Sequence, residues 1–174
     1  MADNWFMLTM IGKDKTGMVA AVTSALVEQD ISLGETSMLR LGGNFTVMMM
    51  VSASCSEQDL RENLAPVLES QGMCLHVDSI EAHLHQHLVP NIQVTVTGAD
   101  RVGIVAQVTQ VLAQGGFNIL DLESDVAGSA DEPVFIMQIV GVSIQAVEQI
   151  DEAMAELREQ GVSVNVSAIE TYIG

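Results

Sequence analysis

Positively charged residues are scarce in this sequence. Six lysines and arginines stand against 23 aspartates and glutamates, which gives a formal net charge of −17 at pH 7 with histidine neutral. Proteins that bind nucleic acid neutralise phosphates with lysine and arginine, and a net field of this sign repels a polyanion. The composition therefore argues against direct contact with nucleic acid.

Cysteine is also rare, and long apolar runs are absent. Cys55 and Cys74 have no CxxC neighbour, which argues against zinc or thioredoxin-like chemistry, and we expect both to be buried thiols. No apolar run approaches the length of a membrane span, although hydrophobic residues make up 48% of the chain. The first residues, MADNWFMLTMIG, contain an early acid and no basic flank, unlike a secretory signal. We therefore expect a cytoplasmic protein that does not engage a membrane.

A duplicated segment dominates what is present. The stretch GKDKTGMVAAVTSAL, from Gly12 to Leu26, returns as GADRVGIVAQVTQVL, from Gly98 to Leu112, at a constant offset of 86 residues. A repeat of this size predicts two small domains in tandem, each able to bury its own core. We place the first at residues 1–82 and the second at 91–174, joined by a linker at 83–90 that contains histidines.

Each half has the pattern of strand, helix, strand, strand, helix, strand. Gly42 and Gly43 predict a two-residue hairpin between the second and third strands of the first half. With right-handed crossovers, this order predicts an α+β fold in which an antiparallel sheet carries both helices on one face, the ferredoxin-like arrangement, twice. In the second half a longer connection, residues 127–133, replaces the glycine pair.

The second helix of each half shows start and stop signals. Ser56 and Asp59 have the spacing of a capping box, and Gly72 marks the end of the helix. Pro66 lies inside it, so we expect a kink or an early end there. In the second half we expect one helix over residues 146–160, with Glu148, Glu152 and Glu156 along one face. That acidic face is solvated or serves as a docking stripe.

The third strand of each half is apolar on both faces. Both alternating residue sets in FTVMMMVSA and VFIMQIV are largely hydrophobic, which a strand with one solvated side would not show. We therefore expect the second face of each sheet to be covered by the other repeat or by another chain, and a homo-oligomer is favoured. The run of methionines could alternatively form an adaptable binding surface.

The turn between the first strand and first helix is the candidate binding site. Gly17 and Gly103 stand at the start of the helix, where free N–H groups and the helix dipole suit a carboxylate. Three of the six basic residues lie in these turns: Lys13, Lys15 and Arg101. Alternatively, Asp14 and Asp100 brace the turn and bond the N–H groups themselves, and the glycine serves close packing.

The duplicated pattern DxxG(I/M)VAxVT on a βαββαβ unit resembles the ACT domain, a regulatory module of amino-acid metabolism. The resemblance implies a small amino-acid ligand at an interface between units, held by this loop and by a polar residue that opens the second strand. The implied ligand-binding residues are Asp14, Gly17 and Met18 in the first repeat and Asp100, Gly103, Ile104 and Asn118 in the second. The first repeat has Ser32 in place of Asn118, and Asn118 could also be a simple turn residue.

Two such units without a catalytic domain resemble the transcriptional repressors of the glycine cleavage system. The resemblance implies a non-enzymatic negative regulator that uses no cofactor and contacts a DNA-binding activator protein, with glycine as a candidate ligand. The alternatives are an amino-acid- or metal-binding protein without a transcriptional role, and a regulator that acts in trans on a metabolic enzyme. No convincing catalytic residue set is present.

Three histidines alternate in the linker. His83, His85 and His87 would project from one side of an extended segment, where imidazoles can bind zinc or nickel. Only Glu81 lies near them as a further ligand, so we assign no metal-binding residue.

Overall fold

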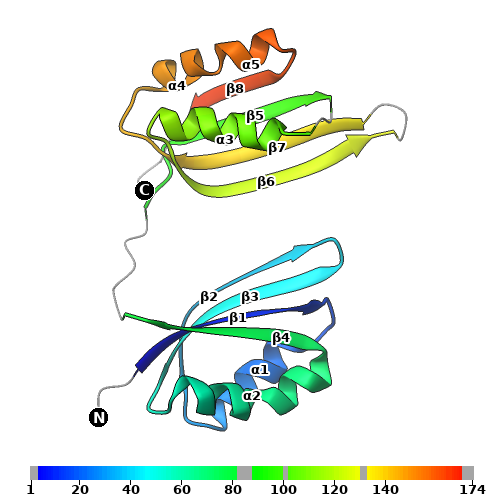
Figure 1. Cartoon of the computed structure of the whole chain (residues 1–174), viewed down its shortest axis with the longest axis vertical. Coiled ribbons are helices and arrows are strands. Elements are labelled where there is room, and N and C mark those ends of the chain that lie inside the picture. The colour runs from blue at the N-terminus through cyan, green and yellow to red at the C-terminus, as the bar shows by residue number, and fades with distance from the viewer. Residues whose placement is uncertain (1–3, 82–87, 100–101, 130–132, 170–174) are drawn as a thin grey trace. The chain divides into compact units, whose positions relative to one another are not determined.

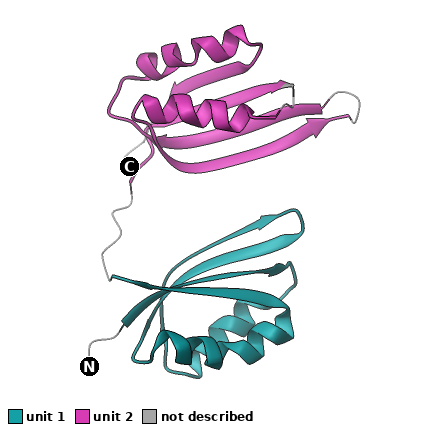
Figure 2. Ribbon diagram, viewed as in Figure 1, with its two compact units in different colours: residues 1–84 teal, residues 85–174 magenta. Residues whose placement is uncertain are grey.

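The computed structural model describes residues 4–81, 88–99, 102–129 and 133–169. The chain divides into two compact units, residues 1–84 and 85–174 (Figure 2).

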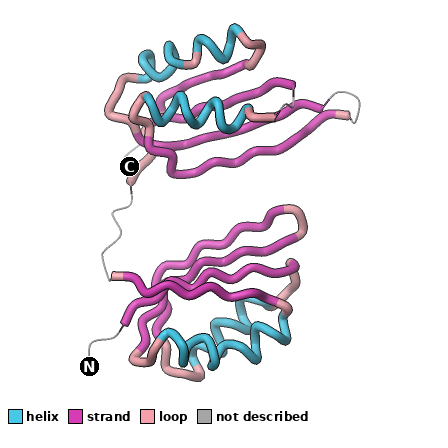
Figure 3. Tube along the Cα trace, viewed as in Figure 1, coloured by secondary structure: helices cyan, strands magenta, loops and turns pink. Residues whose placement is uncertain are grey.

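Unit 1 is a four-stranded antiparallel sheet with two helices on one face (Figures 1 and 3). The strands lie in the order β2-β3-β1-β4. In chain order the elements are β1 (Asn4–Lys13), α1 (Met18–Val27), β2 (Ser32–Leu41), β3 (Asn44–Ala53), α2 (Glu57–Gln71) and β4 (Met73–Ile80).

Unit 2 repeats this topology, with strand order β6-β7-β5-β8. Its elements are β5 (Ile92–Ala99), α3 (Ile104–Gln114), β6 (Asn118–Gly128), β7 (Pro133–Val142), α4 (Val147–Ala153), α5 (Ala155–Glu159) and β8 (Ser163–Ala168). The predicted fold, two ferredoxin-like βαββαβ units in tandem, is confirmed.

Each unit has its own core between the sheet and its helices. In unit 1 alternate residues of β3 point toward the helices, and Phe45, Val47, Met49 and Val51 are buried. Met18, Val22 and Leu26 of α1 pack against this cluster at helical spacing. Phe135, Met137 and Ile139 of β7 occupy the corresponding positions in unit 2.

The local signals for turns and helix ends are confirmed. Gly42 and Gly43 take φ values of 56° and 73°, as a tight hairpin between antiparallel strands requires. The side chain of Ser56 accepts a hydrogen bond from the Asp59 N–H, and the Asp59 carboxylate accepts one from the Ser56 N–H. Gly72 ends α2 with a φ of 67°. The helix does not end early at Pro66 and continues to Gln71.

The single helix expected over residues 146–160 is wrong. It is divided at Met154 into α4 and α5. The carbonyl of Asp151 accepts from the Met154 N–H at 3.1 Å, which tightens the turn, and also from the Arg158 guanidinium at 2.8 Å. These bonds replace the regular helical hydrogen-bond pattern at this point. The division also orients the Arg158 side chain toward β8.

The expectation of two buried thiols is also wrong. Cys55 is half-buried, and Cys74 is exposed on β4. Within the described residues, no helix is long and apolar enough to cross a membrane.

Candidate functional site

The turn between β1 and α1 leaves the helix N-terminus open. Gly17 is the residue before the helix, with φ 91°, and its carbonyl accepts the first helical bond, from Ala21 at 2.9 Å. The N–H groups of the first turn therefore have no helical partner. Among the described residues, no side chain caps them.

Backbone conformation, rather than crowding, explains the glycine. A β-carbon added at Gly17 would meet no atom within 4 Å, so the close-packing explanation fails at this position. The left-handed φ is one that residues with a side chain adopt only at a cost. The glycine therefore fixes the turn that exposes the helix N-terminus.

Asp14 braces the turn, but it does not cap the helix. Its N–H donates to the Gly43 carbonyl at 3.1 Å, which ties the turn to the β2–β3 hairpin. Its carboxylate forms an ion pair with the guanidinium of Arg40 on β2. The Asp14 side chain is 25% exposed and that of Arg40 is 69% exposed, so the pair lies at the protein surface.

An open cavity of about 670 Å³ lies beside this ion pair. The loop from Asp14 to Gly17 and the first turn of α1 form one wall, and Met38 and Arg40 of β2 form another. The buried ring of Phe45 contributes an apolar surface. A helix N-terminus, a cation, an anion and an apolar surface thus surround one space.

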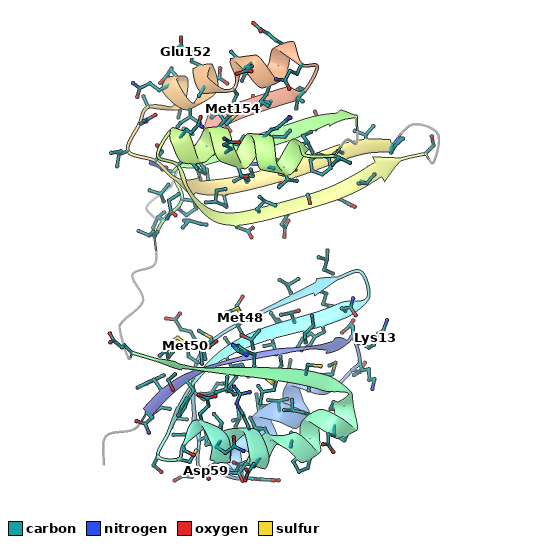
Figure 4. All side chains as sticks on the ribbon, in the orientation of Figure 1. Lys13, Met48, Met50, Asp59, Glu152 and Met154 are labelled. Atoms are coloured by element: carbon teal, nitrogen blue, oxygen red, sulfur yellow. The ribbon has the colours of Figure 1, made fainter. Side chains whose placement is uncertain are left out.

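Lysines contribute less to the cavity than their number in the loop indicates. The ammonium group of Lys15 donates to the Gln71 carbonyl at 3.1 Å, near the C-terminal end of α2, where a cation is favoured. Lys13 ends β1 (Figure 4). It is not among the residues that line the cavity. Arg40 is therefore the main cation beside the α1 N-terminus.

The corresponding turn of unit 2 has the same backbone and different side chains. Gly103 precedes α3 with φ 93°, and Ile104 begins the helix as a buried residue. Register places Val126 opposite Phe135, just as Arg40 lies opposite Phe45. Unit 2 therefore lacks the arginine. The predicted site residue Asp100 and its neighbour Arg101 lie outside the described residues.

The structure brings together only some of the predicted site residues. Asp14, Gly17 and Met18 line one cavity. Asn118 opens β6 opposite Val142, whereas Ala99, beside the loop, pairs with Val134 at the other end of β7. At about 3.3 Å per residue these ends are separated by roughly 25 Å or more. Within one unit, Asn118 cannot share a site with Gly103.

A similar separation, of about 23 Å, holds in unit 1, where Ser32 pairs with Ser52 and Arg40 pairs with Phe45. A residue that opens the second strand could reach this loop only from a different unit. The roles of Ser32 and Asn118 remain predictions.

Arg40 is the residue that sequence reasoning missed. The signal for it was present, because a two-residue hairpin at Gly42 and Gly43 fixes Arg40 opposite Phe45. Phe45 faces the core, so Arg40 lies on the helix side of the sheet, next to the loop.

Comparisons with known proteins agree with this architecture. The sequence profile of the ACT domain family matches residues 4–78 and again 91–167. A UPF0237 protein of Methanococcus maripaludis is 36% identical over 77 residues, which are 44% of this chain and 84% of that protein. A UPF0237 protein of Pyrobaculum aerophilum is 35% identical over 79 residues, 45% of this chain and 88% of its own. These relatives each match about one unit.

Solved structures match both units together. A protein of unknown function from Galdieria sulphuraria has a TM-score of 0.72 and 25% identity, covering 97% of this chain and 99% of its own. A protein provisionally assigned as a glycine cleavage system transcriptional repressor has the same TM-score and coverage at 19% identity, which shows a shared fold.

Proposed function

Because the chain belongs to the ACT domain family, a family of regulatory domains, we propose that it is a regulatory protein that senses a small amino acid at the β1–α1 cavity of unit 1. The observation that carries the proposal is the Asp14–Arg40 ion pair beside an uncapped helix N-terminus.

An α-amino acid fits the charges of this site. Its carboxylate would accept from the first-turn N–H groups of α1 and from Arg40, and its ammonium group would donate to Asp14. Binding would separate the Asp14–Arg40 ion pair and would form two ion pairs with the ligand, one at each of these residues. Surface ion pairs contribute only about 0–1 kcal/mol, so their separation opposes binding little.

The ligand proposal is tested by calorimetry with glycine and serine, and with acetate and methylamine as half-ligands. We expect saturable binding of an amino acid and much weaker binding of either half, because each half leaves one protein charge unpaired. Arg40→Ala and Asp14→Asn should each weaken binding at least about tenfold, which corresponds to the loss of one charged contact.

Lys13→Ala is the matched control, since it removes a neighbouring cation that does not line the cavity. Its affinity should equal that of the wild type. Absence of saturable heat with every amino acid would refute sensing at this site.

We propose further that the protein represses glycine cleavage genes through contact with a DNA-binding activator. The duplicated loop motif, the likeness of the fold to a provisionally assigned repressor and the charge of −17 support this. In a mobility-shift assay the purified protein alone should leave operator DNA unshifted and should change the mobility of an activator–DNA complex. Deletion of the gene should raise glycine cleavage transcripts. Tight, sequence-specific DNA binding by the protein alone would contradict the mechanism.

A further inference from the structure

The sheet of unit 1 has an apolar side that its own helices do not cover, here called the open face of unit 1. Because Phe45, Val47 and Met49 point to the core, the residues between them point the other way. Figure 4 shows Met48 and Met50 on this side, away from α1 and α2. By strand register the open face comprises Trp5, Met7, Thr9, Ile11 and Lys13 of β1, Ser32, Ser37, Leu39 and Leu41 of β2, Asn44, Thr46, Met48, Met50 and Ser52 of β3, and Cys74, His76, Asp78 and Ile80 of β4.

Much of this apolar surface is solvent-exposed in unit 1. Met48 is 44% exposed, Ile11 50% and Leu39 55%. The ring of Trp5 lies on the same face, because a β-carbon at Gly34 of β2 would come within 3.1 Å of it. A continuous exposed apolar patch on a protein marks an interaction surface.

The corresponding side of unit 2 differs in chemistry. Its open face carries Val134, Ile136, Gln138 and Val140 of β7 between polar strands. By register those strands contribute Gln93, Thr95 and Thr97 of β5, Asp121, Glu123 and Asp125 of β6, and Ser163, Asn165 and Ser167 of β8. The strands β5, β6 and β8 therefore do not share the two-sided apolar pattern of β7. The open face of unit 2 is polar enough to remain exposed to solvent.

The charged residues on the two open faces indicate which surface can cover the open face of unit 1. Apolar residues laid on the unit 2 face would desolvate Asp121, Glu123 and Asp125 without supplying a cation to any of them, which is costly for each carboxylate. On the unit 1 face, the charged residues in register are Lys13 at the end of β1 and Asp78 on the edge strand β4, where Asp78 pairs with His76 at 3.1 Å. Glu35 lies in the β2 bulge between Leu33 and Thr36, outside the paired positions. The paired positions at the centre of that face hold no charge, so a second copy matches it.

The area is sufficient for such a contact. A four-stranded face about 19 Å wide and about 26 Å long follows from strand spacing and residue rise, which gives about 1,000 Å² for two copies. This reaches the lower limit of about 1,000 Å² for specific interfaces. In a dimer with a two-fold axis, the apolar centre of one open face would contact the apolar centre of the other. Methionine side chains adapt to an imperfect fit between such surfaces.

We propose that two copies of the chain associate through the open faces of their first units, packed sheet against sheet. The proposal is independent of the ligand cavity, which lies on the helix side of the sheet.

Sedimentation velocity of the full chain, from nanomolar to high micromolar concentration, tests the proposal together with Trp5 emission. Trp5 is the one tryptophan of the chain and lies on the proposed interface. We expect a monomer–dimer equilibrium, and a shift of the emission to shorter wavelength over the same concentrations.

Substitution of Met48 provides the decisive variants. Met48→Glu and Met48→Lys should both raise the dissociation constant at least about a hundredfold, because either charge would be buried twice in the dimer. The matched control is Gln138→Glu, at the equivalent position of β7 on the face of unit 2. Far-UV circular dichroism confirms that each variant is folded.

Three results would overturn the proposal. One is a wild-type monomer at every concentration, including a monomer whose Trp5 emission is already at short wavelength, which would show that the face is covered within one chain. Another is unchanged dimerisation of both Met48 variants. The third is equal dissociation by Gln138→Glu.

Discussion

At the residue scale, the geometry of the candidate cavity depends on one backbone angle. Gly17 holds φ at 91°, and nothing surrounds the place where a side chain would begin. Substitution there changes strain alone, without a steric clash. The cost of the substitution therefore measures how firmly the turn is held.

We expect Gly17→Ala to lower the free energy of unfolding of unit 1 by about 1–2 kcal/mol, the cost of the left-handed conformation. Urea denaturation followed by Trp5 fluorescence reports unit 1, since Trp5 belongs to β1. Gly103→Ala, with φ 93° in unit 2, is the control and should leave the Trp5 transition unchanged. An unchanged midpoint for Gly17→Ala would show that the turn relaxes to a different conformation.

The capping box of α2 makes a second prediction at this scale. Hydrogen bonds from the side chain and then the backbone of Ser56 lower the pKa of Asp59 below its usual value. A carboxyl with a lowered pKa in the folded state stabilises the protein above its unfolded pKa, and the contribution is lost as pH falls through the folded pKa.

Ser56→Ala removes the N-cap side chain of α2 and should destabilise unit 1 by about 1 kcal/mol at neutral pH, the usual cost of losing an N-cap. The difference from wild type should shrink at acidic pH, below the usual range of an aspartate pKa. Thermal unfolding at a series of pH values measures it. A difference that stays constant down to the lowest pH would exclude the carboxylate as the source.

At the element scale, the divided helix of unit 2 depends on Arg158. Its guanidinium donates to the Val164 carbonyl at 2.9 and 3.0 Å and also bonds the carbonyl and carboxylate of Asp151. One planar group thus joins α5, α4 and β8. An ammonium group cannot reproduce this fork of donors.

Arg158→Lys should lower the stability of unit 2 by roughly 1–3 kcal/mol, because partly buried acceptors lose charged donors. Hydrogen exchange of β8 amides is the measurement, with β4 amides of unit 1 as the internal reference. Protection of β8 equal to wild type would show that packing of Leu157 and Val164 alone holds the strand.

Elements fixed by local rules could be predicted from the sequence, and tertiary contacts could not. The hairpin at Gly42, the cap at Ser56 and the stop at Gly72 follow from neighbouring residues. The break at Met154 depends on a bond from Arg158 to Asp151, which helical periodicity does not contain.

The same distinction applies to the candidate site. Asp14, Gly17 and Met18 lie within one short segment, so the sequence alone predicts that they line one space, and their role in binding stays a prediction. Arg40 joins them only through sheet register, so its contribution appears once the strands are paired. The polar face of unit 2 was missed because the apolar pattern of β7 says nothing of its neighbours in the sheet.

At the scale of the whole molecule, net charge and apolar surface have opposite effects on the association of two copies. Each copy carries −17, so two copies repel one another at long range. The proposed interface has no charge at the centre of its paired positions, so added salt would screen repulsion without weakening attraction. Salt dependence therefore distinguishes this interface from one built on ion pairs.

We expect dimerisation to strengthen several-fold as potassium chloride rises from about 10 mM to about 150 mM, because the Debye length falls from about 30 Å to about 8 Å. Sedimentation equilibrium at each salt concentration measures the dissociation constant. Gln138→Glu, which adds one more negative charge to each copy outside the interface, should show a steeper dependence than wild type. An affinity that weakens with salt would place opposite charges within the interface and would contradict an apolar contact between the two open faces.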